Sequence, residues 1–119
     1  MIFENIGFEG KTVQFSVLEH IMESVGFIRA GQWDYERVTY DYKFENMTTG
    51  DVFYLRVPAV AVEGVVEQPH AQLKLGTAYL GKHYYPHGVE YDEEFPDDVV
   101  NTCKSKLHQL NEHLEKVFI

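Results

Sequence analysis

The chain of 119 residues has the length of one domain, and we expect a single domain over residues 1–119. Its composition, 45% hydrophobic and 24% charged, is typical of soluble globular proteins. The formal charge is −9 and the sequence contains no cluster of Lys and Arg, so we expect neither nucleic acid nor an anionic membrane as a partner.

The first helix is predicted over residues 16–25. Ser16 and Glu19 form the S-x-x-E pattern of a capping box, in which each side chain accepts a hydrogen bond from the other residue's backbone N–H. An apolar stripe follows at helical spacing. Gly26 suits the left-handed residue that ends a helix, and Phe27 can fold back onto the last turn as in a Schellman motif.

The clearest strand is predicted over residues 37–45, where apolar and polar side chains alternate strictly. Residues 46–51 are typical of a hairpin connection, and a second strand follows over residues 52–62. Because Pro58 has no N–H to donate to a ladder, we expect a sheet edge or a bulge there.

Three weaker segments are expected to complete the sheet. Residues 71–75 alternate like a strand, and Gly76 after them suggests a bulge. Residues 27–34 are expected to form a strand before the hairpin, and residues 2–15 one more. The pattern therefore predicts an antiparallel sheet of four to six strands.

The last element is a long amphipathic helix. Pro96, Asp97 and Asp98 are typical of a helix start, where proline is tolerated and acids complement the helix dipole. We interpret Cys103 as a small apolar core residue and not as a nucleophile, because it lies on the apolar stripe of this helix. The members of the stripe are Val100, Cys103, Leu107, Leu110, Leu114 and Val117.

These elements predict an α+β fold in which one antiparallel sheet carries both helices on one face. The sequence lacks the ~18–20 consecutive apolar residues of a membrane span and an N-terminal signal pattern. Cys103 is the single cysteine and cannot form an internal disulfide. We therefore expect a cytoplasmic protein.

Residues 81–95 are predicted to be an ordered loop between the last strand and this helix. Such a long connection is usually functional or disordered, and its tyrosines favour order because they bring apolar area to bury. His83 and His87 lie four residues apart, but Pro86 excludes the helix on which that spacing would bring them together. We therefore expect no metal, no cofactor and no catalytic residues here, and the histidines are expected to hold the loop in place.

The arginines offer a second hypothesis. Arg29, Arg37 and Arg56 all fall in predicted strands, where they could converge into an anion pocket with Lys82 and His83 at its rim. Cross-strand pairing with neighbouring acids is the more usual arrangement. The candidate partners are Asp34, Glu36, Asp41 and Glu45.

Two classes of function stay open. The first is a non-enzymatic binding or interaction protein. The alternative is a small-ligand-binding protein or an enzyme with a pocket near residues 81–95, and we predict His83, Tyr85, His87 and Arg56 as its ligand-binding residues.

A homodimer is expected in addition. With both helices on one face, the other face of the sheet meets water or a second subunit. The run Ala59–Val62 and the large rings of Trp33, Tyr35 and Tyr54 suggest an apolar patch on that face, and such patches are typical of interfaces.

Long stretches of the chain resemble the YugN-like family of spore-forming bacilli. They are RAGQWDYERVTYDYKFE at residues 29–45, AVEG at 61–64 and LGKHYYPHGVEY at 80–91. The resemblance runs the length of the chain and implies one α+β domain in a small cytoplasmic protein. The family looks like one without an assigned activity, so it implies no catalytic or binding residues for this chain.

Overall fold

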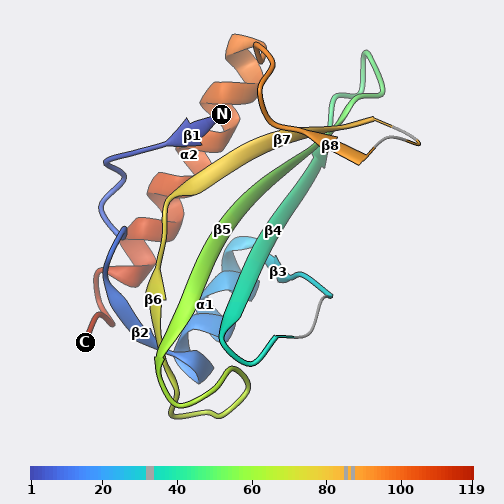
Figure 1. The fold of residues 1–119 in the computed structure, drawn as a ribbon. Helices are drawn as coiled ribbons and strands as arrows, with labels where there is room; N and C mark the ends of the chain where they lie inside the picture. Colours follow the sequence, from blue (N-terminus) through green and yellow to red (C-terminus); the bar gives the residue numbers. More distant parts are fainter. Residues whose placement is uncertain (32–33, 85, 87) are drawn as a thin grey trace.

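The computed structural model contains one sheet of eight strands and two helices (Figure 1), and it describes residues 1–31, 34–84, 86 and 88–119. Within these residues no helix has the length and apolarity to cross a membrane. In chain order the elements are β1 (Ile2–Phe3), β2 (Thr12–Gln14), α1 (Phe15–Val25), β3 (Ile28–Arg29), β4 (Arg37–Glu45), β5 (Val52–Glu63), β6 (Gln72–Leu75), β7 (Ala78–Tyr84), β8 (Gly88–Glu90) and α2 (Asp97–Leu114).

The long strand β5 organises the sheet, and all pairings are antiparallel. One side of β5 pairs with β4 along its length. The other side pairs with β7 over its first half and with β6 over its second half. Short strands extend this arrangement: β1 and β8 pair with β7, β2 pairs with β6, and β3 pairs with β4.

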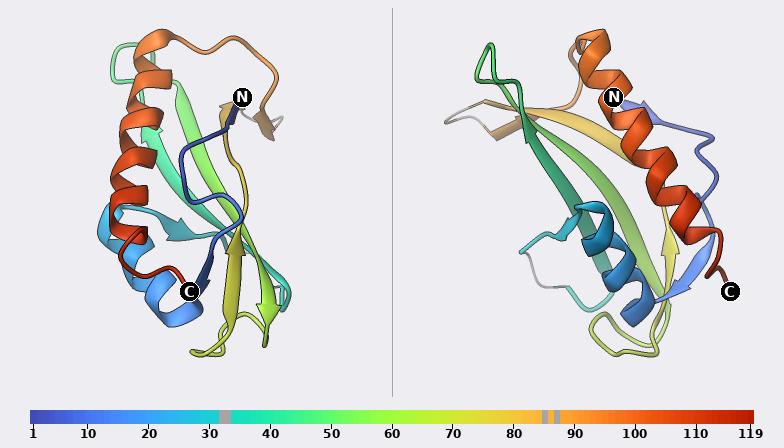
Figure 2. Two further views of the ribbon diagram at one scale, coloured as in Figure 1. Left: turned by 90° about the vertical axis from the view of Figure 1, so that its left-hand side faces the viewer. Right: turned by 180° about the vertical axis from the view of Figure 1, so that it is seen from behind.

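Both helices lie on one face of the sheet (Figure 2), and the core fills the space between the two layers. The sheet contributes its inward side chains, among them Tyr40, Phe53 and Leu55, each at most 2% exposed. Helix α2 contributes Leu107 and Leu110, which are fully buried. No helix of the described residues lies on the opposite face of the sheet.

The prediction of four to six strands is wrong, because the sheet has eight. β1 and β3 are two residues long, and β2 and β8 are three. Such short segments show no alternation that a sequence could reveal, and they become strands because a longer neighbour supplies hydrogen-bonding partners.

Pro58 lies inside β5 and not at a sheet edge. It sits at the point where the neighbour of β5 changes from β7 to β6. There the N–H of Gly76, between those two strands, donates to the Pro58 carbonyl over 2.8 Å. The missing N–H of proline thus falls at a break between two partners, which explains why a central strand tolerates it.

The two ends of α1 differ in how well the sequence predicted them. The Schellman end is confirmed, because Gly26 has φ 101° and the N–H of Phe27 donates to the Met22 carbonyl over 2.8 Å. The capping box is wrong: the helix already begins at Phe15, and its cap position makes no side-chain hydrogen bond. The N–H groups of Phe15 and Ser16 donate instead to carbonyls of the loop before β6.

Candidate functional site

The helix-free face of the sheet carries a cluster of aromatic and charged side chains in register across three strands. Asp41 on β4, Arg56 on β5 and Tyr79 on β7 are direct neighbours in one row. The next row places Tyr54 beside Gly81. We call Asp41, Tyr54, Arg56, Tyr79 and Tyr91 the Arg56 cluster.

Arg56 is the centre of this cluster. Its Nε lies 3.3 Å from Oδ1 of Asp41, and its guanidinium lies over the Tyr54 ring, 5.0 Å from the centroid. Its Nη1 donates a hydrogen bond to the Tyr91 hydroxyl. A guanidinium held on three sides in this way has a fixed orientation, and the Tyr54 ring beside it supplies flat apolar surface.

Tyr91 reaches the cluster because Gly81 leaves room for it. A side-chain Cβ at Gly81 would lie 2.6 Å from Cε1 of Tyr91, which is closer than such atoms approach. The Tyr91 ring also meets the Tyr79 ring edge-on, with centroids 5.3 Å apart. The segment after β8 therefore folds back over the helix-free face and closes one end of it.

The electrostatics of the cluster follow from its partial burial. Burial raises the pKa of the Asp41 carboxyl, and the neighbouring Arg56 guanidinium opposes that shift without cancelling it. Burial also raises the pKa of the Tyr79 hydroxyl, and the nearby Tyr91 adds to the effect. The carboxyl of Asp41 thus binds a proton more readily than a solvated aspartate does.

We expect the Asp41 carboxyl to make stability depend on pH in a defined direction. Its folded pKa is raised above the unfolded value of about 3.9, so the native state binds the proton more tightly. As pH rises from the unfolded to the folded pKa, the contribution of this group to stability must therefore fall. Urea unfolding over that range should show a smaller decrease for Asp41→Asn than for the wild type. An identical pH slope in both proteins would contradict the assignment.

The structure brings two of the four predicted ligand-binding residues near one another. Arg56 lies over the Tyr54 ring, and the His83 ring meets the same Tyr54 ring edge-on at 6.1 Å between centroids. Tyr85 and His87 lie outside the described residues. The predicted loop at residues 81–95 is in part a hairpin, because β7 continues to Tyr84 and β8 pairs with it. The depression beside this hairpin is lined by Tyr84, Gly88, Val89, Glu90 and Glu93.

Arg29 and Arg56 each pair with acids and, among the described residues, are not brought together into an anion pocket. Arg29 contacts Glu19 of α1 at 3.0 Å and Glu67 of the loop after β5 at 2.7 Å. Arg56 pairs with Asp41, its direct cross-strand neighbour. Cross-strand pairing, the more usual arrangement, therefore describes Arg56.

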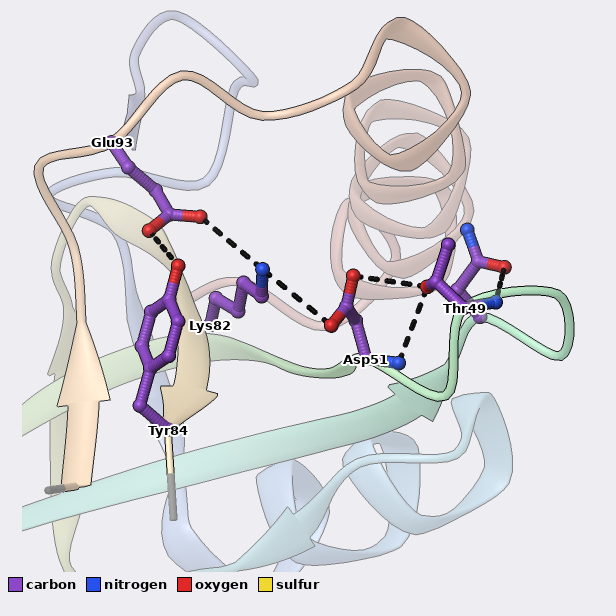
Figure 3. Close-up of polar contacts among 6 residues, drawn as sticks. Thr49, Asp51, Lys82, Tyr84 and Glu93 are labelled. Carbon is purple, nitrogen blue, oxygen red and sulfur yellow. Dashed lines mark hydrogen bonds and ion pairs between the residues drawn. The ribbon is translucent and has the colours of Figure 1, made fainter. Parts of the chain in front are cut away.

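A second polar cluster fixes the position of the β7–β8 hairpin (Figure 3). Nζ of Lys82 lies 3.5 Å from Oδ1 of Asp51 and 3.8 Å from Oε1 of Glu93. The Tyr84 hydroxyl donates to Glu93, which raises the pKa of that hydroxyl. Thr49 in turn donates to Asp51 over 2.9 Å. One lysine therefore ties the β4–β5 turn, strand β7 and the segment before α2 together.

Sequence reasoning missed Tyr79 and the role of Tyr91. Only Ala78, Tyr79 and Leu80 alternate in burial, Gly81 and Lys82 break the alternation, and the tyrosine-rich stretch after Gly81 suggested a loop. The placement of Tyr91 had no local signal, since it depends on a glycine ten positions earlier. Among the described residues, no three His, Cys, Asp or Glu side chains come together as a metal site would require.

Comparison with known proteins places the chain in one family. Residues 5–116 match the YugN-like family. The chain is 50% identical over 117 residues to the uncharacterised protein YlbA of Bacillus subtilis, covering 97% of this chain and 96% of that protein. It is 26% identical over 82 residues to the uncharacterised protein YugN of the same organism, covering 69% of this chain and 60% of that one.

A solved structure has the same fold. The crystal structure of the uncharacterised conserved protein YugN from Geobacillus kaustophilus matches with a TM-score of 0.85 and 49% sequence identity, and the match covers 98% of this chain and 96% of that one. Together with the match over residues 5–116, this shows that the chain belongs to the YugN-like family.

Proposed function

We propose that this protein is a non-enzymatic binding protein whose helix-free face recognises an acidic protein segment. The supporting observation is the charge of that face. The outward positions of β4, β5 and β6 carry four basic and three acidic side chains, a small excess of positive charge although the whole chain has a formal charge of −9. The basic residues are Arg37, Lys43, Arg56 and Lys74, and the acidic ones are Asp41, Glu45 and Glu63, the last of which pairs with the outward Gln72.

The exposed part of this face offers both charge and apolar area. Arg37, Val60 and Lys74 are direct neighbours across β4, β5 and β6, and all three are exposed. Val62 follows on the same strand and is 55% exposed. A basic row around exposed valines complements an acidic segment with apolar residues, and the acidic remainder of the chain would repel such a segment elsewhere.

Titration of the isotope-labelled protein with oligoglutamate and oligolysine peptides of equal length tests the proposal by NMR. We expect oligoglutamate to shift the amide signals of Arg37, Val60 and Lys74, and the shifts should weaken with salt because the contacts are solvent-exposed. The double variant Arg37→Glu with Lys74→Glu should lose most of the binding.

The matched control reverses two exposed lysines elsewhere. Lys104 and Lys116 lie on or just beyond α2, and their change to Glu alters the net charge by the same amount. This variant should bind oligoglutamate nearly as the wild type does. Preferential binding of oligolysine, or shifts confined to the depression beside Tyr84 and Glu93, would overturn the proposal; the second result would favour the small-ligand alternative.

A further inference from the structure

Strand β4 has an open edge at its C-terminal end. Its other neighbour, β3, pairs only with Tyr40 and Asp41, and beyond that point no described strand lies beside β4 (Figures 1 and 2). The backbone groups of β4 alternate in direction: Thr39 accepts a hydrogen bond from the β3 side, and Asn46 donates to the β5 side. By this alternation the N–H and C=O groups of Lys43 and Glu45 point to the open edge.

A free edge of this kind is a template for another strand, and many proteins protect such edges with charged side chains. Lys43 and Glu45 are both exposed and point to the helix-free face. As isolated charges they would hinder the addition of a strand. Because Lys43 and Glu45 have opposite charges and lie two residues apart, however, each can face the other when two copies of β4 lie antiparallel.

We propose that two copies of this chain associate through this edge, with β4 of one copy antiparallel to β4 of the other about a two-fold axis at Phe44. In that register Lys43 lies opposite Glu45 of the second copy, and Glu45 opposite its Lys43. Opposite charges in such directly opposed positions stabilise antiparallel pairs, and like charges destabilise them. The same register directs the free N–H and C=O groups of both residues at one another.

The surroundings of Phe44 are consistent with a covered surface. The Phe44 ring is half-buried on the helix side, where it stacks on Phe53 with centroids 5.4 Å apart. A depression next to it is lined in part by Met47 and Val99, and Met47 is 89% exposed. In a two-fold pair the Phe44 residues of both copies oppose each other without hydrogen bonds, the arrangement that brings side chains closest. The second copy thus covers apolar surface that is otherwise exposed.

The helix-free face is a less suitable site for the expected homodimer. Tyr54, a central ring of that face, already contacts Arg56, Lys43 and His83 within one chain. Association at the β4 edge leaves the row around Val60 accessible and continues the face across two copies. The proposal is independent of the acidic-partner proposal, because an acidic peptide can bind the row around Val60 in a monomer as well.

Charge reversals at Lys43 and Glu45 test the proposal, because reversing both should restore the association that each single reversal weakens. We expect sedimentation of the full-length protein to show self-association that increases with concentration. Lys43→Glu and Glu45→Lys should each weaken it by about tenfold or more, because each change places two pairs of like charges in opposition. The double variant Lys43→Glu with Glu45→Lys restores opposite pairs and should recover the association. Lys104→Glu on α2 serves as the control and should leave it unchanged.

Amide hydrogen exchange distinguishes this interface from any other. As concentration rises, the amides of Lys43 and Glu45 should exchange more slowly, whereas those of Tyr42 and Phe44, which face β5, should not change. A monomer at all concentrations overturns the proposal. So does self-association that the single reversals leave intact, or a double variant as weak as the single variants.

Discussion

Phe53→Ala is expected to lower the free energy of unfolding by about 3–5 kcal/mol, the largest effect among the substitutions considered for this protein. The Phe53 side chain lies in the core between the sheet and the helix layer and is 2% exposed. It packs between Phe44, at 5.4 Å between ring centroids, and Phe95, at 6.2 Å. Removal of the ring leaves a cavity that these two neighbours, held by β4 and by the segment before α2, fill only in part.

Urea unfolding of the variant and of Val60→Ala on the same strand measures the effect. Val60 points to the helix-free face and is 40% exposed, so its truncation should cost no more than about 0.5 kcal/mol. A larger cost for Val60→Ala than for Phe53→Ala would mean that the inward and outward positions of β5 are reversed, because a shift of one residue exchanges the faces.

Gly81→Ala is expected to destabilise the protein by about 1–3 kcal/mol, although alanine in a strand would otherwise be favourable. The added methyl would lie 2.6 Å from the Tyr91 ring and closer still to Val89, so both must move. That cost exceeds the gain of about 0.4–1 kcal/mol from the reduced freedom of the unfolded chain. We expect β8 and Tyr91 to separate from the sheet, and Arg56 to lose its hydrogen bond to Tyr91.

Hydrogen exchange and thermal unfolding together report this change. The amide protection of β8 should fall, while the protection of β5 should stay as in the wild type. Gly31→Ala is the control, because a Cβ at Gly31 meets no atom of the described residues within 4 Å. If Gly81→Ala is as stable as this control, Tyr91 does not lie over Gly81.

The sequence predicted those parts of the fold whose signals are local. The strict alternation at residues 37–45 gave β4 with its correct ends, because every inward residue there meets the core. Gly26 marked the end of α1, because a left-handed backbone is costly for other residues. The apolar stripe of α2 was also a local signal, because a long helix repeats its buried face several times along the sequence.

The candidate site was only partly predictable. Arg56 and Asp41 were named as residues that could meet, and strand register makes them neighbours. Tyr91 was placed in a loop, and nothing near it in the sequence shows that it reaches Arg56. The apolar stripe predicted for α2 did not include the buried Asn111, whose side chain lies against Gly7.

By itself, then, the sequence determined β4, a long β5 and the two helices, because periodic burial and glycine geometry act within a few residues. Tertiary structure alone decided the number of strands, the start of α1 and the assembly of the Arg56 cluster. The two-residue strands form only where β7 or β4 offers free backbone groups. The first N–H groups of α1 use carbonyls more than fifty residues away. Tyr91 lies beside Arg56 because Gly81 has no side chain to keep it out.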